Sequence, residues 1–327
     1  MRRPLLIALA LAVGCRGHVT INFLQPARVT INPEIQVLAP LDRAREGLSG
    51  QSLDTLVEIL AASERYRVIE PPAADRAFAA HPAMVGLPVG REVARGVCDD
   101  TGAQGLVVLE SWHAEPSWSE VQKDVEHTFT EEYTEGGEVK TREVKEQYTV
   151  FVATLHLNTP AFFSTYDCNG RILDSFEAIS HQEVSAEGPT PAEARAAIRD
   201  QNALHFAAAR EVAERYAHRI APLPSSVERA FYKGGALREG ALSAAAGDWE
   251  KASERWQAAA KATEGKARGK ALWDLAVAAE AAGDLSTALD FAERADTLLR
   301  SGASARYLAA LKKRAKQQQR VDRQLGG

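Results

Sequence analysis

The spacing of apolar residues alternates between two patterns over the first 110 residues, and this alternation predicts a small α/β sheet. Short β-prone runs predict strands, and apolar residues at helical spacing between them predict amphipathic helices. The predicted strands are 35–41, 66–70 and 105–110, and the predicted helices are 52–64, 73–80 and 89–101. The third strand is almost wholly apolar, as expected for a strand buried between helices. Strands that alternate with helices in this way are typical of βαβ units.

After Trp112 the pattern changes to polar, β-prone segments, which predict antiparallel strands. Two of these segments flank Gly136-Gly137, and two more flank Asn169-Gly170. Glycine pairs and Asn-Gly pairs favour the tight turns of β-hairpins. We therefore expect a long hairpin over residues 121–150 and a second hairpin that also extends the sheet. Thr190-Pro191 then opens a closing helix over residues 191–220, because threonine is a good N-cap and proline suits the first helical position.

From Pro224 onward the chain is rich in alanine and its apolar residues recur at helical spacing. Gly247-Asp248-Trp249 recurs 36 positions later as Gly283-Asp284-Leu285. A period of this length predicts helix pairs of the tetratricopeptide kind. Trp249 and Trp256 should then be buried between helices. Because two such repeats cannot cover their own faces, we expect them to pack on the closing helix or on the sheet domain.

The first fifteen residues form a pattern of their own. Two arginines precede an apolar run over residues 4–13, which ends in Gly14-Cys15. This arrangement predicts a signal peptide, because a helix across a bilayer needs about 20 residues. The stretch 11–15 resembles the bacterial lipobox, in which the signal is removed and the cysteine becomes the acylated N-terminus. The resemblance implies lipidation at Cys15 and a place in the cell envelope. An ordinary secretory signal and an uncleaved anchor are the alternatives.

These patterns predict a defined order of regions along the chain. We expect a signal peptide over 1–14, a lipid-anchored N-terminus with a leading strand over 15–33, an α/β domain over 34–222, a tetratricopeptide-like helical domain over 224–311 and a basic tail over 312–327. The predicted fold class is therefore α/β, a mixed sheet flanked by helices with an antiparallel hairpin extension, followed by an all-α repeat region. Pro222 and Pro224 mark the boundary between the two folded parts.

Charge is unevenly distributed between these parts. Pro224 onward carries 18 Lys and Arg against 13 Asp and Glu, whereas the preceding residues carry 21 against 31. An acidic N-terminal part argues against a role with nucleic acid. The basic tail has two interpretations, a contact with anionic lipid or a solvated, frayed helix end. Arg16 follows the cysteine where aspartate would favour the inner membrane, so we expect the outer membrane, facing the periplasm.

Besides Cys15, the chain has two cysteines, Cys98 and Cys168. An oxidising periplasm permits a bridge between them. Cys98 falls on a predicted helix and Cys168 beside a hairpin turn, however, and we expect two unpaired thiols, with a disulfide as the alternative. Two cysteines without clustered histidines predict no zinc site, and we expect no metal.

Motifs for catalysis are absent from the sequence. There is no Gly-x-Ser-x-Gly elbow, no His-Glu-x-x-His helix, no phosphate loop and no dinucleotide fingerprint, so the sequence predicts no catalytic residues, no cofactor and no enzyme. The nearest candidate for a site is Trp112, His113 and Trp118. These residues follow the third predicted strand, where α/β sheets often bind ligands. They predict a site for a sugar or an aromatic ligand, with a packed loop as the alternative.

Several short stretches resemble a family of uncharacterised bacterial lipoproteins that join an α/β domain to tetratricopeptide helices. They are Gln25–Val29, Thr165–Asp167, Ile172–Asp174, Arg219–Pro222, Val227–Tyr232, Gly247–Trp249, Trp256 and 271–284. The strand–helix–strand part is also similar to the domain shared by the curli-export lipoprotein and the N-terminal part of the Tol-system propeller protein. That second likeness implies a fold and no function. Within the family's stretch, we expect Arg229, Phe231 and Tyr232 to lock the first C-terminal helix onto the α/β domain.

Anchor, repeats and missing catalytic motifs together predict a lipid-anchored envelope protein. We expect its tetratricopeptide-like helices to act as an assembly scaffold that offers a groove to a protein partner in the periplasm. The alternative is a periplasmic lipoprotein that binds a small ligand or a cell-wall glycan through Trp112, His113 and Trp118. The partner and the oligomeric state are left open by the sequence.

Overall fold

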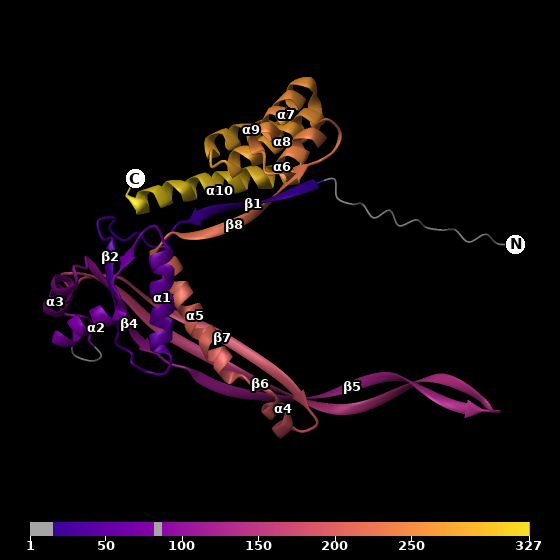
Figure 1. The fold of residues 1–327 in the computed structure, drawn as a ribbon, viewed down its shortest axis with the longest axis horizontal. Helices are drawn as coiled ribbons and strands as arrows, with labels where there is room; N and C mark the ends of the chain where they lie inside the picture. Colours follow the sequence, from indigo (N-terminus) through magenta and orange to yellow (C-terminus); the bar gives the residue numbers. More distant parts are fainter. Residues whose placement is uncertain (1–15, 82–86, 327) are drawn as a thin grey trace. The chain divides into compact units, whose positions relative to one another are not determined.

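A computed structural model describes residues 16–81 and 87–326 (Figure 1). Cys15 and the predicted signal peptide lie outside these residues, so lipidation remains a prediction. The chain forms two compact units: one is Ala27–Ala221, and the other joins the residues up to Pro26 with those from Pro222 onward. Within the described ranges, none of the helices combines the length and the apolar character that crossing a membrane requires.

The α/β unit is built on one mixed sheet. Its strands are β2 (Val37–Asp42), β3 (Arg67–Val68), β4 (Gly105–Trp112), β5 (Glu115–Glu135), β6 (Glu138–Asp167) and β7 (Ile172–Gly188). The strand order is β3-β2-β4-β6-β5, and β7 pairs with the other edge of β6. β2 is parallel to both β3 and β4, whereas β4, β5 and β7 are all antiparallel to β6. The predicted fold class is confirmed.

Helices cover both faces of this sheet. They are α1 (Ser49–Ala62), α2 (Pro71–Ala80), α3 (Arg91–Thr101), α4 (Pro191–Ala197) and α5 (Gln201–Ile220). On one face Phe163 of β6 stacks on Tyr216 of α5, with ring centroids 4.8 Å apart. On the opposite face Tyr166, three positions along the same strand, packs in a cluster with Phe78 of α2. α1 lies beside α5, and α3 lies beside α2 (Figure 1).

The closing helix predicted over 191–220 is two helices. α4 ends at Ala197 and α5 begins at Gln201, because Asp200 takes up a non-helical backbone conformation. The Asp200 side chain accepts a hydrogen bond from the backbone N–H of Ala203 and so caps α5, as Thr190 caps α4 through Glu193.

The predicted long hairpin is formed by β5 and the first part of β6. The two strands pair from Glu115 opposite Asn158 to Glu135 opposite Glu138. Gly136 and Gly137 make the turn with φ of +66° and +85°, which glycine adopts without strain. Nearly every side chain over 119–148 is exposed, and β6 beyond the hairpin continues unbroken into the core of the unit.

Cys98 and Cys168 form a disulfide, so the expectation of two unpaired thiols is wrong. The reason lies in the second hairpin: its Asn169-Gly170 turn packs against the start of α3, where a Cβ on Gly170 would lie 2.8 Å from the backbone nitrogen of Arg91. That contact brings the residue beside the turn to the last turn of α3. Seventy positions separate the two cysteines, and no local signal shows their proximity.

The second unit combines a two-stranded ribbon with helices. Its elements are β1 (Arg16–Gln25), β8 (Leu223–Tyr232), a 3-10 turn η1 (Gly235–Leu237), α6 (Arg238–Ala245), α7 (Trp249–Ala262), α8 (Gly265–Ala281), α9 (Leu285–Leu299) and α10 (Gly302–Leu325). The repeated Gly-Asp pair forms the same joint twice. Gly247 and Gly283 have φ of +81° and +82°, and Asp248 and Asp284 cap the helices that follow.

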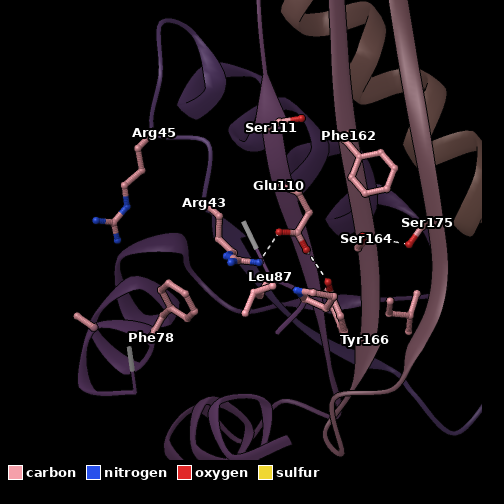
Figure 2. A pocket seen from close by; sticks show the side chains of 13 residues that line it. Arg43, Arg45, Phe78, Leu87, Glu110, Ser111, Phe162, Ser164, Tyr166 and Ser175 are labelled. Atoms are coloured by element: carbon pink, nitrogen blue, oxygen red, sulfur yellow. Dashed lines mark hydrogen bonds and ion pairs between the residues drawn. The ribbon is translucent and has the colours of Figure 1, made fainter. Parts of the chain in front are cut away.

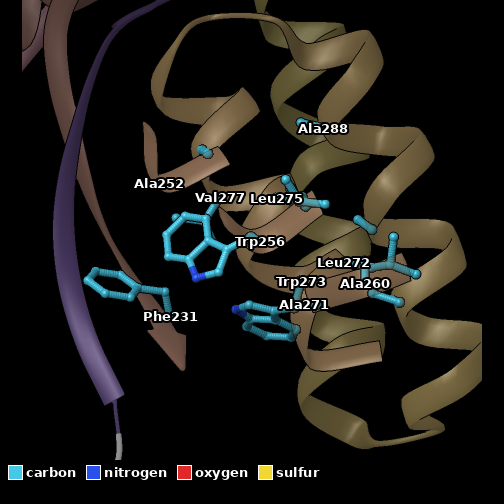
Figure 3. Close-up of a cluster of buried hydrophobic side chains, with 14 of the residues drawn as sticks. Phe231, Ala252, Trp256, Ala260, Ala271, Leu272, Trp273, Leu275, Val277 and Ala288 are labelled. Carbon is cyan, nitrogen blue, oxygen red and sulfur yellow. The ribbon is translucent and has the colours of Figure 1, made fainter. Parts of the chain in front are cut away.

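Trp256 is the largest fully buried side chain in the core of this unit (Figure 3). Its indole packs against Gly240, where any Cβ would collide with the ring, so the crossing of α6 and α7 requires a glycine there. Trp249 is half-buried at the edge of the same cluster, beside Phe231. The predicted burial therefore holds fully for Trp256 and partly for Trp249.

The basic tail predicted over 312–327 is not a separate, frayed segment. Residues 312–325 continue α10, and Leu311, Arg314 and Val321 are buried along it. The Arg314 guanidinium lies 3.6 Å from the ring centroid of Phe23 on β1. The tail's aliphatic and cationic groups thus pack on the ribbon, an interaction with a strand some 290 positions away that composition does not reveal.

Candidate ligand pocket

The α/β unit contains a cavity of about 760 Å³. It lies on the α2–α3 face of the sheet, at the carboxyl ends of the parallel strands β2 and β4 (Figure 2). Open α/β sheets bind ligands beyond these strand ends, and small-molecule sites commonly enclose roughly 300–1,000 Å³. Its lining residues are Arg43, Arg45, Phe78, Ala79, Leu87, Pro88, Glu110, Ser111, Phe162, Ser164, Tyr166, Ile172 and Ser175.

A β-bulge in β4 aims two polar residues into this cavity. Leu109 lies opposite Phe163, and Ser111 lies opposite Phe162, so Glu110 is an extra residue in β4. A bulge places two consecutive side chains on the same face of a sheet, and both Glu110 and Ser111 line the cavity. After the bulge the alternation of faces is reversed, so that Trp112 points to the opposite face.

Glu110 is the centre of a hydrogen-bonded floor. Arg43 Nη1 lies 2.5 Å from Glu110 Oε2, and the Tyr166 hydroxyl donates to Oε1 at 2.6 Å. The Arg43 and Glu110 side chains are only 8% and 15% exposed. Burial, together with the bond to Glu110, raises the pKa of Tyr166 to about 12, which keeps its hydroxyl a donor. Both carboxylate oxygens are engaged, so Glu110 forms a fixed floor and offers no free base.

The walls of the cavity are apolar and partly open to solvent. Leu87, Phe162 and Ile172 are 54%, 38% and 45% exposed although they are large hydrophobic side chains. Exposed apolar groups that converge on a hollow mark a binding surface more often than scattered ones do. A ligand that covered them would gain roughly 25 cal/mol for each Å² of apolar surface removed from water.

Arg45 adds a second cationic group at the edge of the cavity. Arg43 is paired with Glu110, whereas the Arg45 guanidinium forms no salt bridge among the residues that the structure describes and interacts with the Asp75 carboxylate only at longer range. Its backbone takes up a left-handed conformation, with φ of +50°, and its N–H donates to Asp42 Oδ1 at 3.0 Å. This turn after β2 brings the exposed Arg45 to the edge of the cavity.

The residues predicted as a ligand site are only partly brought together. Trp112 and His113 line a different hollow, of about 430 Å³, with Glu46 and His205. The Trp112 side chain is buried, with no hydrogen-bond partner for its indole nitrogen, and His113 Nδ1 lies 3.5 Å from Glu46. Trp118 is elsewhere on the sheet, half-buried beneath Arg195, whose guanidinium lies 5.2 Å from the ring centroid.

Sequence reasoning pointed to this edge of the sheet, but Trp112, His113 and Trp118 do not line the larger cavity. Glu110 ends a predicted strand, and the bulge that turns it inward leaves no mark in the sequence. Arg43 and Arg45 could have been predicted, because charged residues directly after a buried parallel strand lie at the edge of the sheet where ligands bind. Tyr166 could not be placed from the sequence, because the pairing of its strand β6 with β4, which brings it to Glu110, is decided by the whole sheet.

The helical unit presents a contrasting surface. β8 and β1 lie across α8, while α6 contacts β8 and α10 contacts β1. Arg229 forms two hydrogen bonds with Glu280, of 2.9 and 3.0 Å, and the Trp273 indole donates to the Ala230 carbonyl at 2.7 Å. Phe231 packs on Trp256. α6 and α8, the first helices of the pairs α6–α7 and α8–α9, thus pack against the chain's own ribbon. We had expected a protein partner on this face.

This contact also corrects the role expected for Arg229, Phe231 and Tyr232. They attach β8 to α7 and α8, not the first C-terminal helix to the α/β domain. The backbone N–H of Tyr232 donates to Asp274 Oδ1 at 2.9 Å, which completes the attachment. The physical reason is that α8 buries the carboxylates of Asp274 and Glu280, and the arginine and the backbone of β8 are donors within reach of them.

Comparisons with known proteins give two family matches, and neither family has a described function. The family described as "Domain of unknown function (DUF8603)" matches residues 42–232, more than half of the chain, and that described as "Domain of unknown function (DUF6340)" matches residues 238–316. No curated protein and no solved structure matches the chain. Across the described ranges 16–81 and 87–326, no three His, Cys, Asp or Glu side chains are grouped so as to hold a metal ion.

Proposed function

The chain belongs to the family described as "Domain of unknown function (DUF8603)", and we propose that it is a lipid-anchored envelope protein that binds a small amphipathic ligand in the cavity around Glu110. The observation that carries this proposal is the cavity itself: apolar walls, a polar floor that is already paired, and an exposed arginine without a salt bridge at its edge. The anchor is supported by the sequence pattern at Cys15, which favours an outer-membrane location facing the periplasm.

The chemistry of the cavity defines the ligand class. An apolar body would lie against Leu87, Phe162 and Ile172, and an anionic group would meet Arg45, whose planar guanidinium suits carboxylate or phosphate. A cell-wall glycan fits less well, because its many hydroxyls need free hydrogen-bonding partners. The Ser164 and Ser175 hydroxyls are hydrogen-bonded to each other at 3.1 Å, and Glu110, Arg43 and Tyr166 are likewise bonded among themselves. Few polar groups of the cavity are therefore left to bind sugar hydroxyls. The proposal is binding without turnover, since the carboxylate that might act as a base is held by Arg43 and Tyr166.

The test uses 8-anilinonaphthalene-1-sulfonate, which joins an apolar ring system to one anionic group. We expect its fluorescence to report saturable binding to the full chain, and Arg45→Gln to weaken the affinity roughly tenfold, a loss of about 1.4 kcal/mol. Phe162→Ala should also weaken binding, through lost apolar contact.

Arg95→Gln is the matched control, because Arg95 is exposed on α3 and does not line the cavity. The same charge is removed there without touching the site, and the affinity should stay within twofold. Unchanged affinity in Arg45→Gln, or equal losses in both arginine variants, would contradict the proposed site.

A second candidate function is assembly with a protein partner, and the hairpin favours it. On one face of the hairpin Val125 pairs with Tyr148 and Phe129 with Val144, next to Val121 and Tyr133. Val121, Phe129, Tyr133 and Tyr148 are between 36% and 62% exposed. On this face the apolar side chains alternate with charged ones such as Glu131 and Arg142, whereas the opposite face is more polar and is rich in threonines and acids. An exposed face that combines aromatic and charged side chains suits a protein partner, whereas the helical face that contacts the ribbon already holds β8.

Crosslinking in cells followed by immunoprecipitation tests this second candidate. We expect a partner recovered with the wild-type chain to be lost from Phe129→Thr combined with Tyr148→Thr. Thr128→Ser combined with Thr130→Ser changes only the polar face of β5 in the same hairpin, and this variant should retain the partner. Equal recovery with both double variants would rule the apolar face out.

A further inference from the structure

The leading strand begins without a linker after the predicted lipidation site. β1 starts at Arg16, one residue after Cys15, and Arg16 is already paired with Tyr232 of β8. Pairing continues through Gln25 opposite Leu223. Because consecutive α-carbons are about 3.8 Å apart, an acylated Cys15 would hold Arg16 at the level of the lipid headgroups, a layer about 5–7 Å thick in each leaflet.

Three cations lie at this end of the ribbon, and two of them are over the ring of Tyr232. The Arg16 guanidinium lies 5.0 Å from the Tyr232 ring centroid, and the Lys270 ammonium of α8 lies 5.2 Å from it. Arg16 also donates to the Tyr232 hydroxyl at 3.4 Å. Lys233, the residue after β8, packs over Gly17, where a Cβ would be 2.7 Å from Lys233 Cε. Arg16, Lys233 and Lys270 are all exposed.

Two carboxylates lie near this cluster. Asp274 is buried beneath it, is bonded to the backbone N–H of Tyr232 and interacts electrostatically with Arg16 and Lys270, while burial raises its pKa well above its ordinary value. Even when ionised, Asp274 is one negative charge against the three cations. Glu228, farther along β8, lies 3.0 Å from His18. The end of the ribbon where the chain enters the fold is therefore cationic and carries an amphipathic aromatic ring.

We propose that Arg16, Tyr232, Lys233 and Lys270 form the membrane-contact surface of the mature protein, lying against the anionic headgroups of the leaflet that holds the acyl chains of Cys15. This inference rests on the anchor in the proposed function and not on the ligand cavity. Each basic residue near an anionic surface contributes roughly fivefold to binding, and tyrosine is enriched at the membrane interface. The strand cannot act as a loose tether, because Phe23 of β1 is held under Arg314.

Lysine footprinting of the lipidated full chain tests the surface. The protein is reconstituted into vesicles of phosphatidylethanolamine and phosphatidylglycerol and treated with a membrane-impermeant amine-acylating reagent, with the detergent-solubilised protein as reference. We expect mass spectrometry to show acylation of Lys233 and Lys270 reduced at least fivefold by the vesicles. Lys251 and Lys261, exposed on α7 of the same unit, are the matched controls and should change less than twofold.

A second measurement separates failure of the surface from failure of the anchor. Incorporation of a palmitate analogue, lost in Cys15→Ser, reads the anchor directly. Incorporation together with equal acylation of the four lysines overturns the contact surface alone. Absence of incorporation into the wild-type chain overturns the anchor and, with it, this surface.

Discussion

The two units differ in whether a concave surface is left open or is covered by the chain itself. In the α/β unit the sheet extends beyond the α2–α3 pair, and the uncovered strip of β4, β6 and β7 becomes an open cavity (Figure 2). In the helical unit the chain's own ribbon packs against α6, α8 and α10. The comparison teaches that a concave face is a candidate site only where the chain does not fill it.

The buried ion pairs make the same contrast in chemical terms. Arg43–Glu110 borders the open cavity, with Glu110 15% exposed, whereas Glu280 is fully buried and bonded to both Arg229 and Tyr307. Both are arginine–glutamate pairs with a tyrosine donor. The Arg43–Glu110 pair keeps contact with solvent and borders the cavity where a ligand could bind. In the Arg229–Glu280 pair the carboxylate is shielded from solvent, and the pair fixes β8 to α8. Four predictions test the contrast between the two units, from the largest expected effect to the smallest.

The strongest test of the filled unit is Trp256→Ala. Removing a fully buried indole from a core costs about 3–5 kcal/mol of unfolding free energy. We expect hydrogen exchange, read by mass spectrometry, to accelerate in α6–α9 while β4 and β6 keep their protection. Trp118→Ala, at a half-buried site in the other unit, should leave the helices unchanged. Unaltered exchange in Trp256→Ala would contradict the assigned core.

The two ion pairs should respond unequally to the same change. Glu280→Gln leaves Arg229 buried without its counter-charge and should cost about 3 kcal/mol or more, as expected when one partner of a buried pair is removed. Glu110→Gln should cost less, about 1–2 kcal/mol, because Arg43 can then be hydrated through the cavity. Chemical denaturation of both variants measures the difference. Equal losses would mean that the cavity is no more accessible than the helical interior.

The disulfide should stabilise only the α/β unit. Bridging Cys98 and Cys168 closes a loop of 70 positions, and removing such a bridge typically costs about 2–4 kcal/mol. We expect Cys98→Ala combined with Cys168→Ala to lower the midpoint for loss of β4 and α3 protection in denaturant. Protection of α7–α9 should be unaffected. A uniform loss across both units would show that they unfold together.

The smallest effect should come from Tyr166→Phe, through pH. The pKa of Tyr166 is raised to about 12 from an ordinary value near 10, so its neutral form is favoured in the folded state. That contribution is complete below pH 10 and is lost as pH rises through 12. The variant loses a hydrogen bond to a carboxylate, worth about 1.5 kcal/mol at neutral pH, and its stability should decline less between pH 10 and 12. Denaturation at pH 7, 10 and 11.5 checks both parts, and parallel curves would contradict the raised pKa.

Local signals account for what could be predicted. Gly136-Gly137, Asn169-Gly170 and the two Gly-Asp joints each specify a turn within a few residues, and all of these turns are present. Alternating apolar patterns likewise identified the sheet and its helices. The candidate site was predicted less well, since Trp112 and His113 do lie together but Trp118 does not, and Glu110 was overlooked.

Fold class, turns and the expectation of an acylated Cys15 follow from the sequence alone, because helix and strand periodicity and turn chemistry act over short stretches of chain. Tertiary structure alone decided the bulge at Glu110, the Cys98–Cys168 bridge and the pairing of β1 with β8. Each of these features depends on residues that are far apart along the chain. Local propensity does not distinguish between the possible long-range contacts, so tertiary packing selects among them. The same packing decided which hollow stayed open for a ligand and which was filled.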